Sequence, residues 1–439
     1  MSQNTIVIPT RKEIFGWAMY DFANSAFATT ISSVVFNVYF TKVIVGDGGA
    51  EIFGHNIPAS SLWGYTVSLS ILLVVFTAPI LGAIADFSGT KKRFLFLYCY
   101  LACFFTGLLF FAKEGDYIFA MIFYMLANYC FAGSLGFYNA FLPEISTKDN
   151  IGRISGFGWA IGFIGGGILL AINLVMIRNP QLLGIPEEDN LPVRFVILSV
   201  AIWWAVFSVF TFLWVREKTK GNPLPRGENY VSIGFKRLVL TFKKIRQHKE
   251  LFKFLVTFLI YNEGIETVIV MAAIFGSEIL GMSQSEIVTL FLLGQIVAFC
   301  GSLLLGYLAD RYSNKTAITL SLIIWCVLVI WAYFMKTRFE FWTIGVFIAF
   351  ILGGSQAVSR SLFGLFTPRE NTAEFFGFFA LGGKFSSAIG PFTFAFIRHA
   401  FDSIRIAIIA LIVFFSLGLL LILFVNERRG IEESRKPIG

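Results

Sequence analysis

The chain has 439 residues, of which 56% are hydrophobic and only 14% are charged. With a mean hydropathy of +0.75 it cannot be dispersed in water as one globule, so we expect an integral membrane protein. The formal net charge of +8 would suit a nucleic-acid partner, but most lysines and arginines fall in alternate loops between apolar runs, which membrane topology explains without nucleic acid.

Apolar runs of about 20 residues, long enough to span a hydrocarbon core, recur along the chain with polar breaks between them. The first run contains Asp21 and Asn24 and lacks a small-residue cleavage site, so we expect a retained span and not a signal peptide. Because the basic loops alternate, both termini are expected in the cytoplasm. The twelve predicted spans are 15–40, 61–85, 94–112, 117–142, 153–176, 193–215, 251–275, 286–308, 316–336, 341–363, 373–398 and 403–425.

One segment, residues 216–250, is a basic linker with glycines and prolines near its start. It divides the chain into an N-terminal six-helix bundle, residues 1–215, and a C-terminal bundle with a cytoplasmic tail, residues 251–439. Within the linker, residues 235–245 place apolar side chains at helical spacing against lysines and arginines. This pattern fits a helix on the inner membrane surface, and a solvated linker is the equally weighted alternative.

The pattern Gly-x-x-Ala-Asp occurs twice, as Gly82–Asp86 and Gly306–Asp310, 224 residues apart. A lysine follows each aspartate by five residues, at Lys91 and Lys315. The triplets 132–134 and 353–355 also match, at an offset of 221 residues. These matches indicate a duplicated six-helix unit, and a transporter whose two repeats rock against each other is built in this way.

The repeated aspartates have a physical use at the cytoplasmic ends of the helices. The glycine of each motif permits close helix contact, and the aspartate can accept hydrogen bonds from the end of a neighbouring helix and pair with a cation. The alternative is an ordinary interface charge beside the following lysine. The predicted gate consists of Gly82, Asp86, Arg153, Gly306, Asp310, Arg311 and Arg360.

Polar side chains inside the spans predict a solute and coupling cavity between the bundles, because ionisable groups in a membrane are costly. The candidates are Asp21, Asn24, Ser25, Asn128, Tyr138, Asn262, Glu263, Glu266, Gln356 and Lys384. Helical spacing puts Asp21, Asn24 and Ser25 on one face of the first span, and Glu263 and Glu266 on one face of the seventh. Lys384 needs an anionic partner, either a buried carboxylate or the solute, and a purely structural ion pair is the alternative.

Other chemistry finds little support. The five cysteines lie in apolar runs and the three histidines are far apart, so no metal or other cofactor is predicted. There is no nucleophile–base constellation, so we do not expect an enzyme. In the fifth span Gly158, Gly162 and Gly166 are spaced by four and predict a helix-packing surface, not a nucleotide loop.

Several segments resemble a known family. Six spans plus six, cytoplasmic termini and a basic central loop resemble the major facilitator superfamily, which implies an all-α membrane protein with twelve transmembrane helices in two six-helix bundles. Phe87 stands where that superfamily's loop often has arginine, and Ser313 replaces the second glycine. The segments that resemble its vacuole-effluxer branch are Trp17–Phe27, Tyr138–Glu144, Tyr261–Thr267, Gln356–Ser361 and Glu374–Gly377.

That branch includes autophagy-related amino-acid effluxers of fungal vacuoles and many bacterial members. The resemblance implies a monomeric permease for small organic solutes, amino acids first, with export the leading direction and a bacterial plasma membrane the leading location. Glu263 and Glu266 stand where we expect Asp and Gln in the family, which leaves solute and coupling ion open.

For the mechanism, proton coupling through Asp21 and the Glu263/Glu266 pair is our hypothesis, because burial and like charge favour protonation of carboxylates. Uniport is the competing mechanism. Sugars or small peptides are alternative solutes. A non-transporting membrane sensor or assembly partner with the basic linker as its output is the alternative function.

Overall fold

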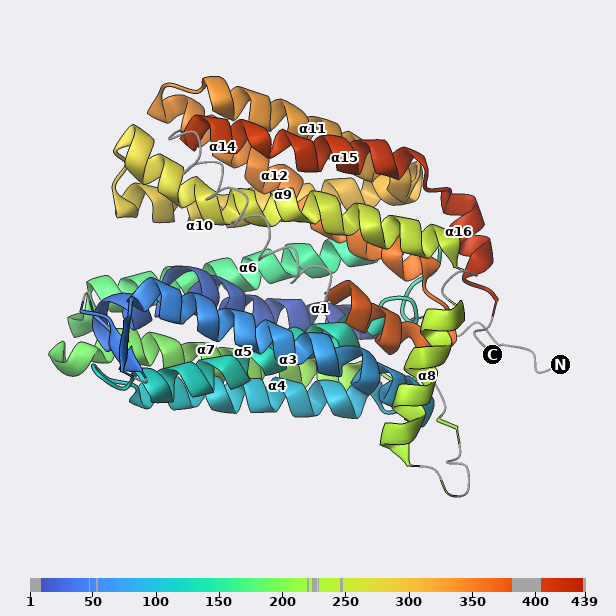
Figure 1. The fold of residues 1–439 in the computed structure, drawn as a ribbon, viewed down its shortest axis with the longest axis horizontal. Helices are drawn as coiled ribbons and strands as arrows, with labels where there is room; N and C mark the ends of the chain where they lie inside the picture. Colours follow the sequence, from blue (N-terminus) through green and yellow to red (C-terminus); the bar gives the residue numbers. More distant parts are fainter. Residues whose placement is uncertain are drawn as a thin grey trace.

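The computed structural model describes residues 9–46, 48–52, 54–218, 221–222, 227, 229–244, 248–380 and 404–436. Long helices dominate, and ten of the described helical segments are long and apolar enough to cross a membrane. Figure 1 shows these helices running roughly alongside one another, with the start of α1 and the C-terminal helix α16 at the same end. We call this the inner end, following the prediction that both termini face the cytoplasm, and the opposite end the outer end.

The first part of the chain forms the helices drawn in blue to green in Figure 1. A two-stranded antiparallel hairpin pairs Ala50 with Ile57 near the outer end. The elements are α1 Arg11–Ala26, the π-helix η1 Phe27–Val34, α2 Phe36–Tyr39, the π-helix η2 Phe40–Ile44, β1 Ala50–Ile52, β2 His55–Ile57, α3 Ala59–Ser88, α4 Lys91–Leu108, η3 Leu109–Phe111, α5 Tyr117–Ala140, α6 Ile151–Arg178, η4 Pro180–Leu183, η5 Glu188–Asn190 and α7 Leu191–Trp214.

The second part of the chain is drawn in yellow-green to red. The elements are α8 Tyr230–Lys244, α9 Lys249–Leu280, α10 Gln284–Arg311, α11 Asn314–Phe334, α12 Arg338–Phe366, η7 Arg369–Asn371, a helix at 372–380, α14 Ile404–Ala410, α15 Ile412–Leu423 and α16 Glu427–Glu433. Helices α9 to α12 and α15 pack among themselves, as do α1 and α3 to α7, and α6 contacts both α10 and α12 across the two groups.

Local sequence sets where these helices begin. Thr10, Ser283 and Thr337 each cap a helix and share a reciprocal capping box with a glutamate three residues later. The two repeated loops end differently. Gly89 follows α3 with a φ of 61°, a conformation that suits glycine, whereas its counterpart Ser313 is extended and caps α11.

The predicted spans agree with the described helices, with three differences. The first helical stretch continues past residue 40 to Ile44 through two π-helical segments. The linker helix α8 is present and begins at Tyr230, five residues before the predicted start. The eleventh predicted span, 373–398, lies mostly outside the described residues. The three glycines Gly158, Gly162 and Gly166 of α6 pack closely against the first helical stretch. A Cβ at these positions would contact Trp17, Ser25 and Thr29, respectively.

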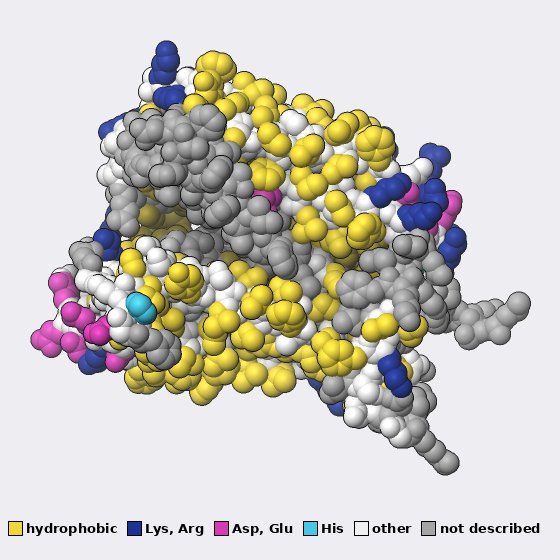
Figure 2. Space-filling model, viewed as in Figure 1, with side chains coloured by type: hydrophobic (Ala, Val, Ile, Leu, Met, Phe, Trp, Pro, Cys, Tyr) yellow, Lys and Arg dark blue, Asp and Glu magenta, His cyan; other side chains and the backbone are white. Residues whose placement is uncertain are grey.

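Apolar side chains cover the outside of the helices. Phe76, Phe104 and Leu213 are each more than half exposed. Figure 2 shows hydrophobic side chains along the helices on this face, while most charged side chains gather at the two ends. An apolar belt between polar ends is the surface that a bilayer solvates.

At the inner end, helix α16 and the start of α9 are joined by buried carboxylates. Glu433 accepts a hydrogen bond from the Glu250 amide at 3.0 Å, and Glu250 accepts one from the Asn426 amide at 2.8 Å. His248 lies beside this junction, fully buried, with its ring edge-on to Phe375. Burial lowers the pKa of His248. The negative charge of Glu433 raises this pKa, the positive charge of Lys436 lowers it, and burial is the largest effect.

We expect acidification to destabilise this junction. Because the pKa of His248 is lower in the folded protein than in the unfolded chain, its contribution to stability is present above the ordinary histidine pKa and is lost as pH falls below it. The wild-type melting temperature should drop between pH 7 and pH 5, and His248→Phe should reduce that drop by about 1–2 °C. Thermal unfolding in detergent measures it, with the exposed His55→Phe as the matched control. An identical pH profile for wild type and His248→Phe would contradict this assignment.

Candidate functional site

A buried ion pair joins the two groups of helices. Asp21 of α1 accepts a hydrogen bond from Arg360 Nη1 of α12 at 3.0 Å and one from the Tyr138 hydroxyl of α5 at 2.7 Å, both at Oδ2. The side chains of Arg360 and Asp21 are only 3% and 10% exposed. Removal of either partner would therefore leave a charge inside the protein without its counter-ion.

The guanidinium of Arg360 is bound on several sides. It donates to the Asn139 side chain at 3.2 Å, to the Ser155 hydroxyl at 3.0 Å and to the Ser155 carbonyl at 2.7 Å. Its carbon also lies 4.8 Å from the Trp17 ring and 5.3 Å from the Trp159 ring. The planar donors of arginine suit such a site, which lysine could not fill in the same way.

The place of Arg360 corrects one sequence prediction. We expected it in the cytoplasmic gate as a candidate cation partner of Asp86, but its described hydrogen bonds go to α1, α5 and α6. The reason is geometric, because Arg360 lies well over a turn before the end of α12 and faces α6 there. Gly158 of α6 makes room, since a Cβ at that position would come within 2.9 Å of both Arg360 Nη2 and Asp21 Oδ2.

Asp86 lies at the inner end of α3 and binds the start of the helix at 372–380. Its two carboxylate oxygens accept the backbone amides of Ala373 at 3.1 Å and Glu374 at 2.9 Å. Gly82 allows this approach, because a Cβ there would lie 2.5 Å from the Ala373 carbonyl oxygen. The fully buried Lys91 is close to Asp86, at 3.8 Å, and also binds Glu144.

Asp310 makes the same kind of contact in the opposite direction. Its oxygens accept the amides of Gly152 at 2.7 Å and Arg153 at 2.9 Å, at the start of α6, and the Arg153 side chain pairs with it at 2.9 Å. Gly306 packs against Gly152, because a Cβ at position 306 would lie 2.6 Å from the Gly152 carbonyl oxygen. Arg311 is exposed at the end of α10. Each repeated aspartate thus caps a helix from the other half of the sequence, where the positive end of the helix dipole stabilises a carboxylate.

Polar side chains form a layer one helical turn outward from the Arg360 pair. Asn24 follows Asp21 on α1, Trp159 follows Ser155 on α6, and Gln356 precedes Arg360 on α12, each by about one turn. The Gln356 amide donates to the Asn262 side chain of α9 at 3.1 Å. Within the described residues, Asn24 Nδ2, Trp159 Nε1 and Asn262 Nδ2 are buried donors without an acceptor. Buried donors of this kind suit a bound acceptor group.

The other predicted cavity residues are placed as follows. Glu263 is buried next to Asn262 on α9, and Glu266 and Ser25 are partly buried. Asn128 instead donates to Ser70 of α3 at 2.6 Å, inside the first group of helices. Lys384 lies outside the described residues.

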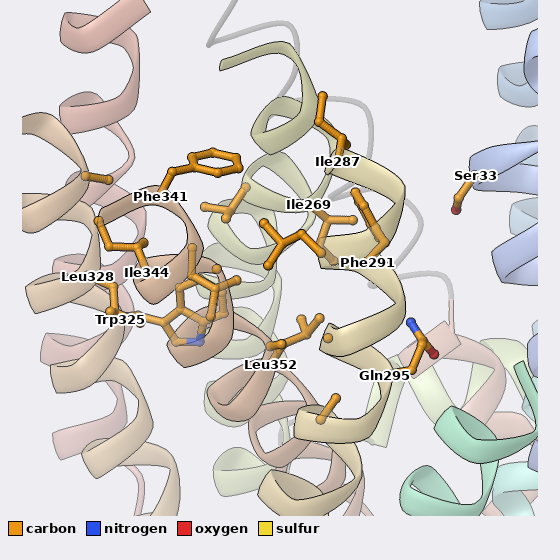
Figure 3. Close-up of a pocket in the computed structure, with 18 of the residues that line it drawn as sticks. Ser33, Ile269, Ile287, Phe291, Gln295, Trp325, Leu328, Phe341, Ile344 and Leu352 are labelled. Carbon is orange, nitrogen blue, oxygen red and sulfur yellow. The ribbon is translucent and has the colours of Figure 1, made fainter. Parts of the chain in front are cut away.

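A cavity of about 280 Å³ lies outward of the polar layer. Figure 3 shows Ile287, Phe291 and Gln295 on α10, Trp325 and Leu328 on α11, and Phe341, Ile344 and Leu352 on α12 around it, with Ser33 facing from η1. Thr29 and Phe163 also line it, and they lie about one turn outward of Ser25 and Trp159. Polar side chains are few among the lining residues, mainly Thr29, Ser33 and Gln295. None of the described residues predicted for the cavity lines it.

Sequence reasoning missed Ser155 and Trp159, which bind or contact Arg360, and the apolar lining of the cavity. Ser155 could have been noticed as a polar residue four positions before Trp159 in the glycine-rich fifth span. The apolar lining residues carry no such signal, because in sequence they are indistinguishable from residues that face lipid.

Comparison with known proteins decides the family. The family model described as vacuole effluxer Atg22 like matches residues 9–435. The chain belongs to this family. The MFS-type transporter YxiO of Bacillus subtilis (strain 168), itself called uncharacterized, is 30% identical over 97% of each chain. Autophagy-related protein 22 of Yarrowia lipolytica is 24% identical over 88% of this chain and 78% of its own.

Solved structures agree on the fold. The proton:xylose symporter XylE superposes with a TM-score of 0.69 over 96% of this chain and 98% of its own, at 12% identity. A bacterial homologue of the iron transporter ferroportin in an outward-facing state gives 0.66 over 94% and 98%. This Atg22-like chain is therefore a transporter of the major facilitator superfamily with that superfamily's all-helical membrane fold, as the resemblance implied.

We expect the Arg360 pair to respond asymmetrically to mutation. Arg360→Ala should cost about 3–5 kcal/mol of stability, because it leaves Asp21 buried without its cation, whereas Asp21→Asn combined with Arg360→Gln should recover part of that loss. Titration with sodium dodecyl sulfate in mixed micelles measures the free energy of unfolding. Arg153→Gln, whose side chain is 57% exposed, is the control and should lose at most about 1 kcal/mol. Equal losses for Arg360→Ala and the control would show that the buried pair is not a central contact.

We expect the two aspartate caps to hold the inner end closed. Loss of a charged hydrogen-bond acceptor costs about 1.5–3 kcal/mol, so Asp86→Ala or Asp310→Ala should raise the share of molecules open at the inner end by about tenfold or more. Spin labels are placed at Lys148 and Tyr312 in a variant without native cysteines. Double electron–electron resonance should report a longer distance between the two labels in Asp86→Ala and Asp310→Ala than in the parent protein.

The matched control is Asp189→Ala, which removes an exposed carboxylate paired with Lys113 near the outer end. Unchanged label distances in both Asp86→Ala and Asp310→Ala would exclude a closing role for the caps.

Proposed function

We propose that this transporter moves small zwitterionic solutes, amino acids above all, by alternating access coupled to protons. The observation that carries the proposal is the Asp21–Arg360 ion pair between the two groups of helices, with a polar layer and an apolar cavity stacked outward of it. The description of the family as vacuole effluxers supports export from the enclosed compartment as the direction.

The cavity favours a small and partly apolar solute. Its volume of about 280 Å³ lies near the lower limit of ~300–1,000 Å³ that is usual for ligand pockets. Most of its wall is aliphatic or aromatic. A sugar would bring hydroxyl groups against that wall without partners, at a free-energy cost for each, whereas the side chain of an apolar amino acid would bury its surface there favourably.

The polar layer suits the head group of such a solute. Amide and indole donors from Asn24, Trp159 and Asn262 could hold a carboxylate, and the side-chain amide oxygen of Gln295 suits an ammonium group. These groups come from α1, α6, α9 and α10, so a solute bound to them would touch both groups of helices. Contacts that reach both halves give a solute the differential affinity that alternating access needs.

Closure of the inner end supports alternating access as the mechanism. Asp86 and Asp310 each join a helix from one half of the sequence to a helix from the other half there, and the cavity lies on the outer side of the Arg360 pair. Protonation of Asp21 would remove the counter-charge of Arg360 and weaken the contact between α1 and α12. A proton could thereby change the relative stability of the two arrangements, with Glu263 and Glu266 as further carriers.

We expect proton-driven accumulation of radiolabelled leucine in proteoliposomes. A gradient of one pH unit supplies about 1.4 kcal/mol per proton, enough for roughly tenfold accumulation at one proton per solute. If Asp21 carries the proton, Asp21→Asn should abolish accumulation and retain exchange of leucine across the membrane. If Glu263 or Glu266 carries it instead, Glu263→Gln or Glu266→Gln should have this effect.

Asp189→Asn, which also removes a carboxylate but lies far from the site, should accumulate leucine as wild type does. A gradient response that survives in all three carboxylate variants would rule out these carriers. Accumulation of glucose but not of leucine would reject the solute class while leaving the coupling intact.

A further inference from the structure

The linker helix α8 lies at the edge of the helix bundle. Figure 1 shows it running across the direction of the other helices at the inner end, and its lower part extends past α3 and α4. It contacts α3, where Gly234 packs against Ile80 and Ile84. A Cβ at position 234 would lie 2.8 Å from the Ile84 side chain and 3.2 Å from the Ile80 side chain.

The position on α3 fixes what surrounds α8. Ile80 and Ile84 continue, at four-residue spacing, a stripe on α3 that includes Leu69, Leu72 and Phe76, which are 49%, 47% and 67% exposed. The side chains of Leu69, Leu72 and Phe76 face outward from the bundle along the apolar belt, which is the lipid-facing surface of a membrane protein. A helix seated on the inner end of this stripe lies at the boundary between acyl chains and headgroups.

The side chains of α8 match that boundary. Phe235, Val239 and Leu240 are exposed by 52%, 50% and 44%, which water would disfavour. The helix carries no acidic residue, and its sequence supplies Lys236, Arg237, Lys243 and Lys244. Exposed apolar residues on a helix whose sequence is rich in lysine and arginine are the signature of a helix that binds the interface of an anionic bilayer.

We propose that α8 is a docking site for anionic phospholipid headgroups of the leaflet at the inner end. Its apolar side chains enter the acyl boundary beside α3, and its cations pair with phosphate groups. The occupant is the bilayer and not a soluble protein, because the helix is continuous with the lipid-facing stripe of α3. This inference is independent of the transported solute.

The test places an environment-sensitive bimane probe at Val239→Cys, in the full-length chain without native cysteines. The protein is reconstituted in nanodiscs of phosphatidylcholine alone or with about one-third phosphatidylglycerol. We expect a blue shift of emission and less quenching by iodide in the anionic discs. High salt should weaken both effects because it screens charge.

Two controls make the result decisive. Substitution of the four α8 cations by glutamine should abolish the response to phosphatidylglycerol, whereas substitution of four other exposed inner-end cations, Lys148, Arg428, Arg435 and Lys436, should leave it intact. A probe at the exposed Tyr312→Cys should not respond to lipid composition, and added inorganic phosphate should not reproduce the shift. The proposal is overturned if the Val239 probe reports water in both kinds of disc, or if its response persists without the α8 cations.

Discussion

The structure depends on one buried guanidinium. Arg360 carries a positive charge into the space between two groups of helices, where an unpaired charge would cost several kcal/mol. Every feature around it reduces that cost. Asp21 supplies the counter-charge, Ser155 and Asn139 accept three further hydrogen bonds from it, and aromatic rings lie close to it. The glycine at Gly158 lets α6 approach closely enough for these contacts to form.

Around this centre the two halves hold each other in a reciprocal way. Asp86 caps a helix of the second half and Asp310 caps α6 of the first, and the capped amides are themselves related by the offset of 221 residues that separates Gly152 from Ala373. The lysines that follow differ. Lys91 is buried among Asp86, Glu144 and Thr372, whereas Lys315 binds carbonyl oxygens at the end of α15. The pseudo-symmetric closure is thus more deeply buried on the Asp86 side, and the two caps need not contribute equally.

Much of this could be predicted from residue patterns, because repeats and membrane periodicity are local signals. The paired motifs at Asp86 and Asp310 predicted the duplication, and runs of apolar residues predicted the spans. The partner of Arg360 could not be read in the same way, since spacing along α12 does not say which helix lies opposite. The apolar lining of the cavity could not be predicted for a related reason. Phe291 and Ile344 face an internal space and Phe76 faces outward, but only tertiary packing separates the two kinds of apolar residue.

The stacking of ion pair, polar layer and cavity restricts how a proton and a solute could be coupled. In the proposed cycle the polar layer holds the solute carboxylate one helical turn outward of the Asp21–Arg360 pair, so solute and proton act at neighbouring sites. Protonation of Asp21 would remove the counter-charge of Arg360 and weaken the contact between α1 and α12 beside the bound solute. Weakening of the Arg360 contact with α1 would also loosen the contact between the halves, so solute binding and opening of the inner end would draw on the same free energy. In the proposed cycle, one arginine placed between both halves links the two events without any longer chain of contacts.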